Sequence, residues 1–218
     1  MTGADTEKRA AAEAAAELVE EGMTVGLGTG STVAFLLPAL ARRGLRDIRC
    51  VATSVATSEQ ARELGIPVEV FDSLARLEIA IDGTDEVTPD GWLIKGGGGA
   101  HLREKVVAAA AARFVVIADS SKPVEALRGP VPLELFGFGL ASTLARLGPE
   151  VELRGVPASP DGGAIADYRG AGLDDPAALA ARFEADPGIA AHGLFPPALV
   201  DDVLIARGEA VEHRRLDG

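Results

Sequence analysis

Cysteine, aromatic residues and lysine are all scarce in this sequence. Its single cysteine, Cys50, excludes a disulfide within the chain, and nothing else indicates an oxidising compartment. Only 4% of the residues are aromatic although 47% are hydrophobic, so the core has to be built mainly from alanine, valine, leucine and isoleucine. Apolar runs fall short of the ~20 residues that a membrane-spanning helix needs, and the N-terminus lacks a basic segment followed by an apolar one. We therefore expect a soluble cytoplasmic protein.

Positive charge is also in short supply. The formal net charge is -12 at pH 7, which disfavours nucleic acid and an anionic membrane surface as partners because both repel a negatively charged protein. An anionic small molecule is compatible with this charge if its pocket has a local positive field. With 218 residues, the chain is long enough for one large α/β domain, or for one such domain with a smaller lobe.

The lysines stand out because there are only four of them among 21 basic residues. Lys95 begins a run that continues with four glycines, Lys105 follows a glutamate, Lys122 follows two serines, and Lys8 lies in the first expected helix. An ammonium group is a compact, strongly hydrated charge on a flexible stem, which suits contact with a phosphate or a developing oxyanion. The alternative that this count alone leaves open is a composition that favours arginine over lysine, with four lysines present by chance.

Apolar segments alternate with helical patterns over the first 118 residues. We expect strands at residues 23–27, 47–53, 66–71, 77–81, 92–94 and 114–118. We expect helices at residues 6–21, 31–43, 58–64 and 101–113. Because most of these strands are apolar throughout rather than alternating, they indicate a parallel sheet with helices on both faces.

The pattern changes at the Gly-Pro-Val-Pro segment of residues 129–132. Beyond it we expect helices at 141–147 and 175–184, and strands near Val151, near Ala164 and at 203–205. This order predicts a smaller α+β lobe. We therefore assign residues 1–129 and 206–218 to a larger catalytic domain, and residues 130–205 to the lobe.

The first glycine-rich loop, Gly26-Leu27-Gly28-Thr29-Gly30-Ser31-Thr32, follows an expected strand and precedes an expected helix. Such a loop directs backbone N–H groups and the positive end of the helix toward an anion. A dinucleotide fingerprint would have glycine in place of Ser31 and an acid after the second strand, and a Walker loop would have lysine before the serine. A phosphate-binding loop without a nucleotide is therefore favoured, and a tight turn without a ligand remains the alternative.

Three carboxylates and a lysine gather in the second candidate region. Asp82, Asp85 and Glu86 come just after a buried strand, where open α/β sheets bind their ligands. Lys95 and its four glycines follow, and then the helix that contains Glu104. Together they supply an acid–base carboxylate, a cation and backbone N–H donors, which are what proton abstraction beside a carbonyl requires. Each residue taken alone also has a structural explanation, as a turn or a solvated helix face.

A metal site is not indicated by nitrogen or sulfur ligands, because the three histidines are scattered and Cys50 has no partner. Oxygen ligands for Mg²⁺ at Asp82, Asp85 and Glu86 are left open by the sequence. A Ser/His/Asp nucleophile is not apparent. The hydroxyls of residues 54, 57 and 58 favour helix capping and ligand binding about equally.

Six motifs in the first 122 residues occur together, and their combination resembles the ribose-5-phosphate isomerase A family. The motifs are Gly-Leu-Gly-Thr-Gly-Ser-Thr at 26–32, Ala-Thr-Ser at 52–54, Asp-Gly-Thr-Asp-Glu at 82–86, Lys-Gly-Gly-Gly-Gly-Ala at 95–100, Arg-Glu-Lys at 103–105 and Ala-Asp-Ser-Ser-Lys at 118–122. Looser matches continue at 130–134, 186–189 and 193–195, so the resemblance covers essentially the whole chain. It implies a Rossmann-like parallel sheet with a small ferredoxin-like α+β lobe.

The resemblance also implies an activity, namely interconversion of D-ribose 5-phosphate and D-ribulose 5-phosphate through an enediolate. Glu104 falls on the general base, Asp82 and Asp85 fall on acids of ring opening and proton transfer, and Lys95 falls on the group that stabilises the enediolate. The positions implied for substrate binding are Lys8, Gly28, Thr29, Gly30, Ser31, Thr32, Asp82, Gly83, Thr84, Asp85, Lys95, Gly96, Gly97, Gly98 and Lys122. The resemblance further implies a homodimer or a tetramer that needs no cofactor, and no metal site is expected.

Two segments depart from the family pattern, residues 135–139 and residues 159–163. Both lie in the expected lobe, so they bear on its packing and on subunit contacts more than on the chemistry. Two other functions remain as alternatives: a sugar-phosphate sensor that binds without turnover, and a sugar-phosphate deaminase or lactonase on a similar fold. The acidic composition and the presence of the whole carboxylate–lysine–glutamate set weigh against the sensor.

Overall fold

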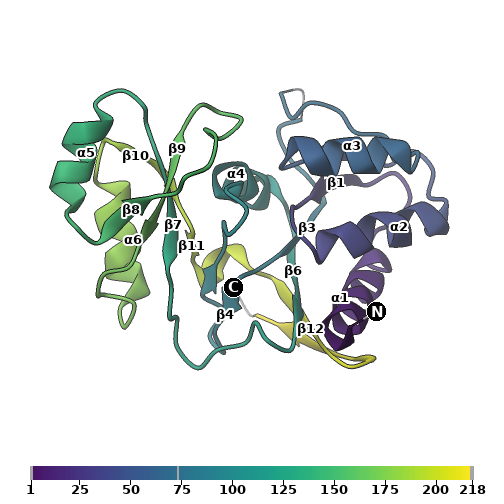
Figure 1. The fold of residues 1–218 in the computed structure, drawn as a ribbon. Coiled ribbons are helices and arrows are strands. Elements are labelled where there is room, and N and C mark those ends of the chain that lie inside the picture. Colours follow the sequence, from purple (N-terminus) through teal and green to yellow (C-terminus); the bar gives the residue numbers. More distant parts are fainter. Residues whose placement is uncertain (1, 73, 217–218) are drawn as a thin grey trace. The chain divides into compact units, whose positions relative to one another are not determined.

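The computed structural model describes residues 2–72 and 74–216, which form two compact units (Figure 1). The larger unit comprises the described residues up to Thr84, Arg103–Pro123 and those from Pro197 onward, and the smaller comprises Asp85–Leu102 and Val124–Pro196. The division expected from the sequence differs at three places. Residues 85–102 and 124–129 belong to the smaller unit, and residues 197–205 to the larger one, because the chain passes between the units four times rather than twice.

A six-stranded sheet forms the centre of the larger unit. Its strands are β1 (Thr24–Leu27), β2 (Arg49–Ala52), β3 (Ile79–Gly83), β6 (Phe114–Asp119), β12 (Asp202–Arg207) and β13 (Ala210–Arg215). Their order is β13-β12-β6-β3-β1-β2, and all pair in parallel except the edge strand β13. Without β13, this is the 2-1-3-4-5 order of a doubly wound sheet, in which the chain reverses direction between β1 and β3.

Helices cover both faces of this sheet, as predicted. Val25 and Leu27 of β1 pack into one core with α1 (Gly3–Ala16), α2 (Val33–Arg43) and α3 (Val55–Glu63). Gly26 points to the other face, where a Cβ would lie 2.5 Å from Val107 of α4 (His101–Ala110). Figure 1 shows α4 on one side of the sheet and α1 and α2 on the other. Two apolar faces on one strand explain why the strands are apolar throughout.

The helix ends follow local sequence signals. Thr2 and Asp5 form a capping box at the start of α1, and the Ser54 hydroxyl accepts the Thr57 N–H at the start of α3. Gly44 ends α2 in the left-handed conformation, with φ 58°. The helix expected at 6–21 therefore lies at 3–16, and the one expected at 58–64 starts earlier, at Val55.

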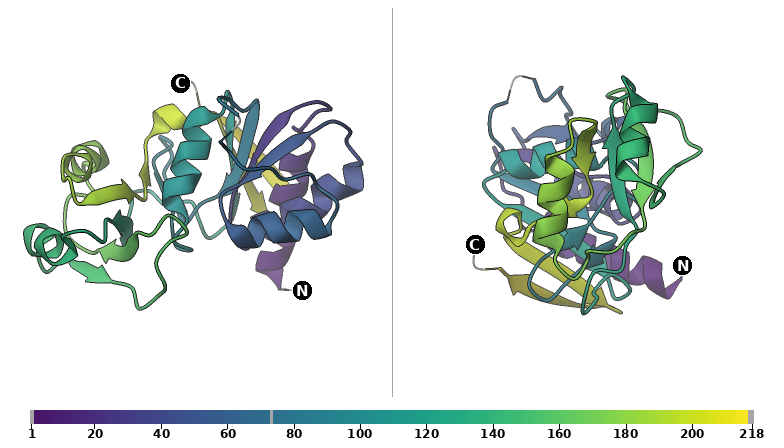
Figure 2. Two further views of the ribbon diagram at one scale, coloured as in Figure 1. Left: turned by 90° about the horizontal axis from the view of Figure 1, so that it is seen from above. Right: turned by 90° about the vertical axis from the view of Figure 1, so that its left-hand side faces the viewer.

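The smaller unit is built on a four-stranded antiparallel sheet. Its elements are β7 (Val131–Leu135), α5 (Leu140–Leu147), β8 (Val151–Leu153), β9 (Ala164–Tyr168), α6 (Pro176–Glu184) and β10 (Ile189–His192). The strand order β10-β7-β9-β8 with this βαββαβ sequence is the ferredoxin-like arrangement that the resemblance implied. Figures 1 and 2 show both helices on one side of the sheet, and Leu147 and Phe183 of these helices join one apolar core with β7 and β9.

Three short strands complete the smaller unit. β4 (Glu86–Val87), β5 (Leu93–Ile94) and β11 (Leu194–Phe195) pair in the order β11-β5-β4, all antiparallel. A short 3-10 helix (Pro197–Leu199) then begins the last segment of the larger unit. Among the described residues, every helix is too short or too polar to cross a membrane.

The strand expected at 66–71 is wrong. Only Val68 forms a bridge there, with Cys50 of β2. Val70 is 68% exposed, so the segment does not bury alternate side chains as a strand against a core would. Strands β4, β7, β10, β11 and β13 were not expected, and β7 and β13 show why. β7 contains Pro132 and resembles a linker, whereas β13 is a polar, mostly exposed edge strand.

Candidate active site

The first glycine-rich loop is fixed to the neighbouring strand by Asp82. The Gly28 N–H donates to the Ile81 carbonyl at 2.9 Å, and the Thr29 N–H donates to Asp82 Oδ1 at 3.0 Å. A Cβ on residue 28 would lie 1.9 Å from that same Oδ1. Glycine is therefore required at position 28 because the backbone lies directly against a carboxylate. This contact stands at the carboxyl ends of β1 and β3, where the doubly wound topology places ligands.

Asp82 is itself held in place from two sides. Its side chain is buried, with the residue 3% exposed. The same Oδ1 that accepts the Thr29 N–H also accepts the N–H of Gly83, at 2.7 Å. A carboxylate that receives two backbone donors has a fixed orientation, which is what a proton-transferring group at a sugar oxygen needs.

Hydroxyl groups support the loop from the side of β2 and α3. Thr29 Oγ1 lies 2.8 Å from Thr53 Oγ1 and 3.2 Å from Thr57 Oγ1. Thr57 Oγ1 donates to the Gly28 carbonyl at 3.0 Å. Ser54 caps α3, so the capping explanation holds for Ser54, whereas the Thr57 hydroxyl supports the glycine-rich loop itself. The sequence indicated the role of Thr57 only by its place at a strand–helix junction.

Lys8 reaches the far end of the same loop. Its Nζ donates to Ser31 Oγ at 3.0 Å. Between Thr29 and Ser31, Gly30 has φ +111°, and a Cβ there would meet open space. Thr32 follows as a buried residue at the start of α2. A lysine, a hydroxyl and the N-terminus of a helix therefore meet at one point, which is the composition of an anion site.

Glu7 anchors the helix that bears Lys8, and its role was not expected from the sequence. Its carboxylate accepts the Gly208 N–H at 3.0 Å and the N–H and hydroxyl of Ser120 at 2.9 and 2.7 Å. The hydrogen bonds from Gly208 and Ser120 lower the pKa of Glu7 to about 2. Its position next to Lys8 was the only signal in the sequence.

Lys122 follows β6, the neighbour of β3 in the sheet. Its N–H donates to the Asp119 carbonyl at 3.2 Å, and Asp119 Oδ1 accepts the Ser121 N–H at 2.9 Å. This tight turn places the segment Ser120–Lys122 at the carboxyl edge of the sheet, the same edge that holds the loop after β1.

The second glycine-rich loop belongs to the smaller unit. Lys95 is buried, its N–H donates to the Gly193 carbonyl at 2.9 Å, and its Nζ lies 5.6 Å from the centre of the Phe195 ring. Gly96 has φ +103°, and a Cβ on it would lie 2.6 Å from Nδ1 of His101. The Gly97 N–H donates to Asp85 Oδ2 at 2.8 Å. Asp85 thus contacts the glycine run twelve residues further along the chain.

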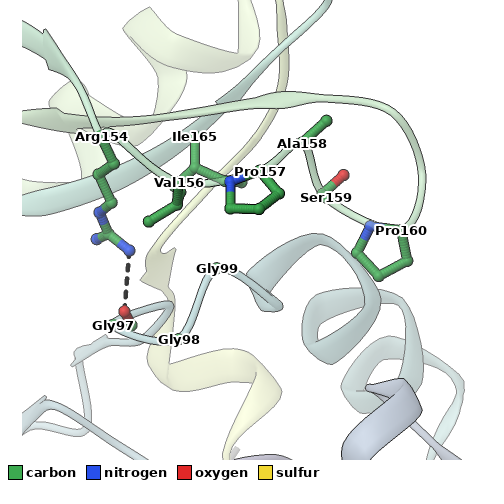
Figure 3. A pocket seen from close by; sticks show the side chains of 10 residues that line it. All are labelled: Gly97, Gly98, Gly99, Arg154, Val156, Pro157, Ala158, Ser159, Pro160 and Ile165. Carbon is green, nitrogen blue, oxygen red and sulfur yellow. Dashed lines mark hydrogen bonds between the residues drawn. The ribbon is translucent and has the colours of Figure 1, made fainter.

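Arg154 contacts this loop from the ferredoxin-like sheet. One guanidinium nitrogen, Nη1, donates to the carbonyls of Gly96 and Gly97 at 3.0 and 2.9 Å. Figure 3 shows Arg154 above Gly97, at the end of a cavity of ≈ 360 Å³ that is lined by residues 97–99, Arg154, residues 156–160 and Ile165. Sequence reasoning missed Arg154, because nothing in the sequence links it to a loop more than fifty residues earlier.

Glu104 lies in the first turn of α4 and is 5% exposed. In the sequence, this helix begins two residues after the last glycine of the run. Glu86 has a structural role instead, because its carboxylate accepts the backbone N–H of Arg128 at 2.8 Å and the Arg128 Nε–H at 3.3 Å. Within the described residues, no group of three or more histidine, cysteine, aspartate or glutamate side chains is arranged to hold a metal ion.

The two units divide the expected site residues between them. The larger unit contains Lys8, Gly28, Thr29, Gly30, Ser31, Thr32, Asp82, Gly83, Thr84, Glu104 and Lys122, and the smaller contains Asp85, Lys95, Gly96, Gly97 and Gly98. Direct hydrogen bonds connect Lys8 with Ser31, Thr29 and Gly83 with Asp82, and Gly97 with Asp85.

The fold and these loops define an α/β protein of the doubly wound class, with one glycine-rich loop at the reversal point of its sheet and a ferredoxin-like unit that contains a second glycine-rich loop. Comparison with known proteins narrows this class. The family model described as Ribose 5-phosphate isomerase A (phosphoriboisomerase A) matches residues 49–210. This chain belongs to the ribose 5-phosphate isomerase A family.

Curated relatives support the assignment over nearly the whole length. Ribose-5-phosphate isomerase A of Caulobacter vibrioides is 47% identical over 221 residues, covering 95% of this chain and 97% of the relative. The enzyme of the same name from Roseiflexus castenholzii is 49% identical over 202 residues, covering 86% of each chain. A second family model, the DeoR C terminal sensor domain, matches residues 4–71 only.

Solved structures agree with the fold. Ribose 5 phosphate isomerase A from Neisseria gonorrhoeae is similar with a TM-score of 0.92 and 35% identity, covering 99% of this chain and 98% of that one. A D-ribose-5-phosphate isomerase in complex with phospho-erythronic acid is similar with a TM-score of 0.89 and 33% identity, covering 95% and 97%. The predicted Rossmann-like sheet with an α+β lobe is thereby confirmed.

Proposed function

We propose that this protein is a ribose-5-phosphate isomerase that interconverts D-ribose 5-phosphate and D-ribulose 5-phosphate in the pentose phosphate pathway. The observation that carries the proposal is the family membership over nearly the whole chain, together with a glycine-rich anion loop whose backbone lies directly against Asp82. The partial match to a sensor domain ends at residue 71, before Asp82, Lys95 and Glu104, so it accounts for ligand binding but not for these three residues.

The 5-phosphate is assigned to the larger unit. Lys8 and Ser31 are already hydrogen-bonded to each other at 3.0 Å, and Thr32 is the N-cap of α2, whose positive end favours an anion. Lys122 supplies a second ammonium from the same edge of the sheet. Two lysines provide the local positive field that a protein of net charge -12 needs in order to bind a phosphate.

The chemistry is a proton transfer between neighbouring carbons. Glu104 removes the proton from C2 of the open-chain aldose, the electron pair moves toward the C1 carbonyl oxygen to give an enediolate, and the same proton is delivered to C1 to give the ketose. Asp82 and Asp85 open the sugar ring and move protons between its oxygens. Lys95 and the glycine N–H groups that follow it stabilise the negative oxygen.

This route requires no cofactor, because the aldehyde is reduced and the neighbouring alcohol carbon is oxidised within one molecule. We also propose a homodimer or a tetramer as the assembly and the cytoplasm as the location. The supporting observation is the family membership.

The first test is an assay of the purified protein, treated with EDTA, with ribose 5-phosphate as substrate and ribulose 5-phosphate as the product measured. Rapid equilibration without metal or nucleotide is expected. Tight binding without conversion would favour the sensor, and a preference for a phosphorylated amino sugar or lactone would favour the deaminase or lactonase.

The second test addresses Glu104 alone. Glu104→Gln keeps the shape of the side chain but removes the base, so we expect kcat to fall by about 100- to 10,000-fold, the usual span for a general acid–base residue. Glu59→Gln, on the exposed side of α3, is the matched control and should retain normal turnover. Near-normal turnover in a folded Glu104→Gln protein would remove Glu104 from this role.

A further inference from the structure

A run of four glycines has no conformation of its own. Glycine accesses both signs of φ with little cost, so the residues 96–99 sample many backbone shapes unless other groups fix them. The proposed function requires one shape, because N–H groups stabilise an oxyanion only when they are oriented before the reaction begins. Contacts from other residues must therefore hold this run in one conformation.

Arg154 contacts the run at two consecutive residues. Its Nη1 donates to two consecutive carbonyls, those of Gly96 and Gly97, at 3.0 and 2.9 Å. Its Nε and Nη2 form a bidentate pair with Asp167 of β9, at 3.0 and 2.6 Å. The side chains of Arg154 and Asp167 are only 18% and 12% exposed. The Arg154 guanidinium therefore bridges strand β9 and the loop in a fixed orientation, rather than acting as a mobile surface charge.

Peptide planarity turns these carbonyl contacts into an orientation of N–H groups. In a trans peptide, the C=O of one residue and the N–H of the next point in opposite directions. Arg154 holds the Gly96 carbonyl, and the N–H of the same peptide, that of Gly97, donates to Asp85 at 2.8 Å. It also holds the Gly97 carbonyl, so the Gly98 N–H points away from Arg154. Gly98 is exposed, and its N–H has no acceptor among the described residues.

We propose that Arg154, fixed by Asp167, is a positioning residue that orients two parts of the isomerase site: the Gly98 N–H as an oxyanion donor, and the Asp85 carboxylate through the Gly97 N–H. This inference rests on the proposed function. The guanidinium does not serve as the phosphate site, since three of its nitrogens already donate to four protein oxygens. Lysine cannot replace it, because one ammonium cannot bind Asp167 in a bidentate manner and hold both carbonyls.

The main test is Arg154→Lys, which retains the positive charge but loses the planar guanidinium that binds Asp167 and both carbonyls. We expect kcat for ribose 5-phosphate to fall by about 100-fold, the size of effect that a misplacement of ~1 Å produces, with a smaller change in KM. Arg146→Lys is the matched control, because Arg146 forms a similar bidentate pair with Asp186 in the same unit, at 3.1 and 2.8 Å. Its kcat should be unchanged.

A binding measurement separates a positioning role from a general structural one. Phospho-erythronic acid carries a planar carboxylate, which resembles the charged enediolate, and a phosphate. Its affinity should fall at least tenfold in Arg154→Lys, whereas the affinity for inorganic phosphate, assigned to the larger unit, should stay as in the wild type. An equal loss for both ligands, or a kcat loss no larger than in Arg146→Lys, would overturn the proposal.

Amide hydrogen exchange tests the geometry without any turnover. The Gly97 amide should exchange faster in Arg154→Lys than in the wild type, because its hydrogen bond to Asp85 loosens, while amides of β7 and β9 stay protected. If Arg154 variants fail to fold, Asp167→Asn, which weakens the bidentate pair, replaces them in all three measurements. A wild type without isomerase activity would defeat the proposed function, whereas unchanged exchange and unchanged phospho-erythronic acid binding in the variant would defeat the role of Arg154.

Discussion

The two glycine-rich loops are held in a fixed conformation by different contacts. In both, an aspartate accepts backbone N–H groups: Asp82 accepts those of Thr29 and Gly83, and Asp85 accepts that of Gly97. The first loop is otherwise held by nearby hydroxyls and by the strand and helix on either side of it. The second is held at its carbonyls by Arg154, from a strand pair far along the chain.

This difference shows that the number of consecutive glycines in a loop determines how many outside contacts are needed to fix its backbone. The first loop alternates glycine with other residues and continues directly into α2, so fewer of its consecutive residues have the conformational freedom of glycine. The second has four glycines in succession and depends on long-range contacts. The first loop should therefore tolerate the loss of a supporting side chain but not the replacement of Gly28. The second loop should tolerate the replacement of Gly97 but not the loss of Arg154.

The strongest test of this contrast compares Gly28→Ala with Gly97→Ala. At position 28 a Cβ would lie 1.9 Å from Oδ1 of the buried Asp82, and at position 97 it would lie 2.8 Å from Oδ1 of the exposed Asp85, which can rotate away. We expect Gly28→Ala to lower the free energy of unfolding by about 3 kcal/mol, and Gly97→Ala by less than about 1 kcal/mol. Chemical denaturation measures both, and equal losses would contradict the contrast.

A second test separates phosphate binding from the chemistry of the second loop. Lys122→Ala removes an ammonium assigned to the 5-phosphate, so KM for ribose 5-phosphate should rise about 10- to 100-fold, the range of a charge-assisted hydrogen bond. The efficiency with unphosphorylated ribose should change little. Arg42→Ala, which removes an exposed ion pair with Glu13 in the same unit, is the control. Equal effects on both sugars would show that Lys122 does not contact the phosphate.

A third test removes one supporting hydroxyl from the first loop. Thr57→Val preserves the shape of the side chain but loses the hydrogen bond to the Gly28 carbonyl. The expected loss in unfolding free energy is about 1 kcal/mol, with kcat reduced less than in Arg154→Lys. A kcat loss as large as in Arg154→Lys would show that the first loop also depends on a single supporting side chain.

The smallest effect is expected at Glu7 and depends on pH. Hydrogen bonds from Gly208 and Ser120 lower its pKa in the folded protein from 4.5 to about 2. Such a carboxylate stabilises the fold fully above pH 4.5, and this contribution is lost as the pH falls toward 2. Glu7→Gln should therefore be less stable than the wild type at pH 7, with a difference that shrinks between pH 4.5 and pH 2. A difference that is constant with pH would contradict this assignment.

Most of the larger unit could be predicted from the sequence because its elements obey local rules. Buried strands β1, β3 and β6 read as apolar runs, and Gly44 ends α2 as expected. The loop at 26–32 was recognisable because its pattern of glycines lies between a strand and a helix. The failure at 66–71 arose because a short apolar segment that contains Pro67 looks like a strand even where it forms a single β-bridge with β2.

The smaller unit was harder to predict, for a physical reason. Its strand β7 contains Pro132, which suggests a linker, although all five residues of the strand are buried and pair with β9, and its last three residues also pair with β10. Arg154 and Asp167 are ordinary surface residues by sequence. Their importance arises only from pairing between β8, β9 and the glycine run, which no local pattern encodes. The catalytic roles assigned to Glu104, Asp82, Asp85 and Lys95 came from the family resemblance and stay predictions.

The place of β12 in the sheet has a consequence for how this protein is made. β12 lies between β6 and β13, yet roughly 80 residues of chain separate the end of β6 from its start. At synthesis rates of ~5–20 residues per second, β6 waits about 4–16 s on the ribosome as an uncovered sheet edge. The whole ferredoxin-like sheet emerges during that interval. β12 therefore covers the edge of a sheet that was begun much earlier, so the larger unit can complete its fold only after the ferredoxin-like sheet has been synthesised.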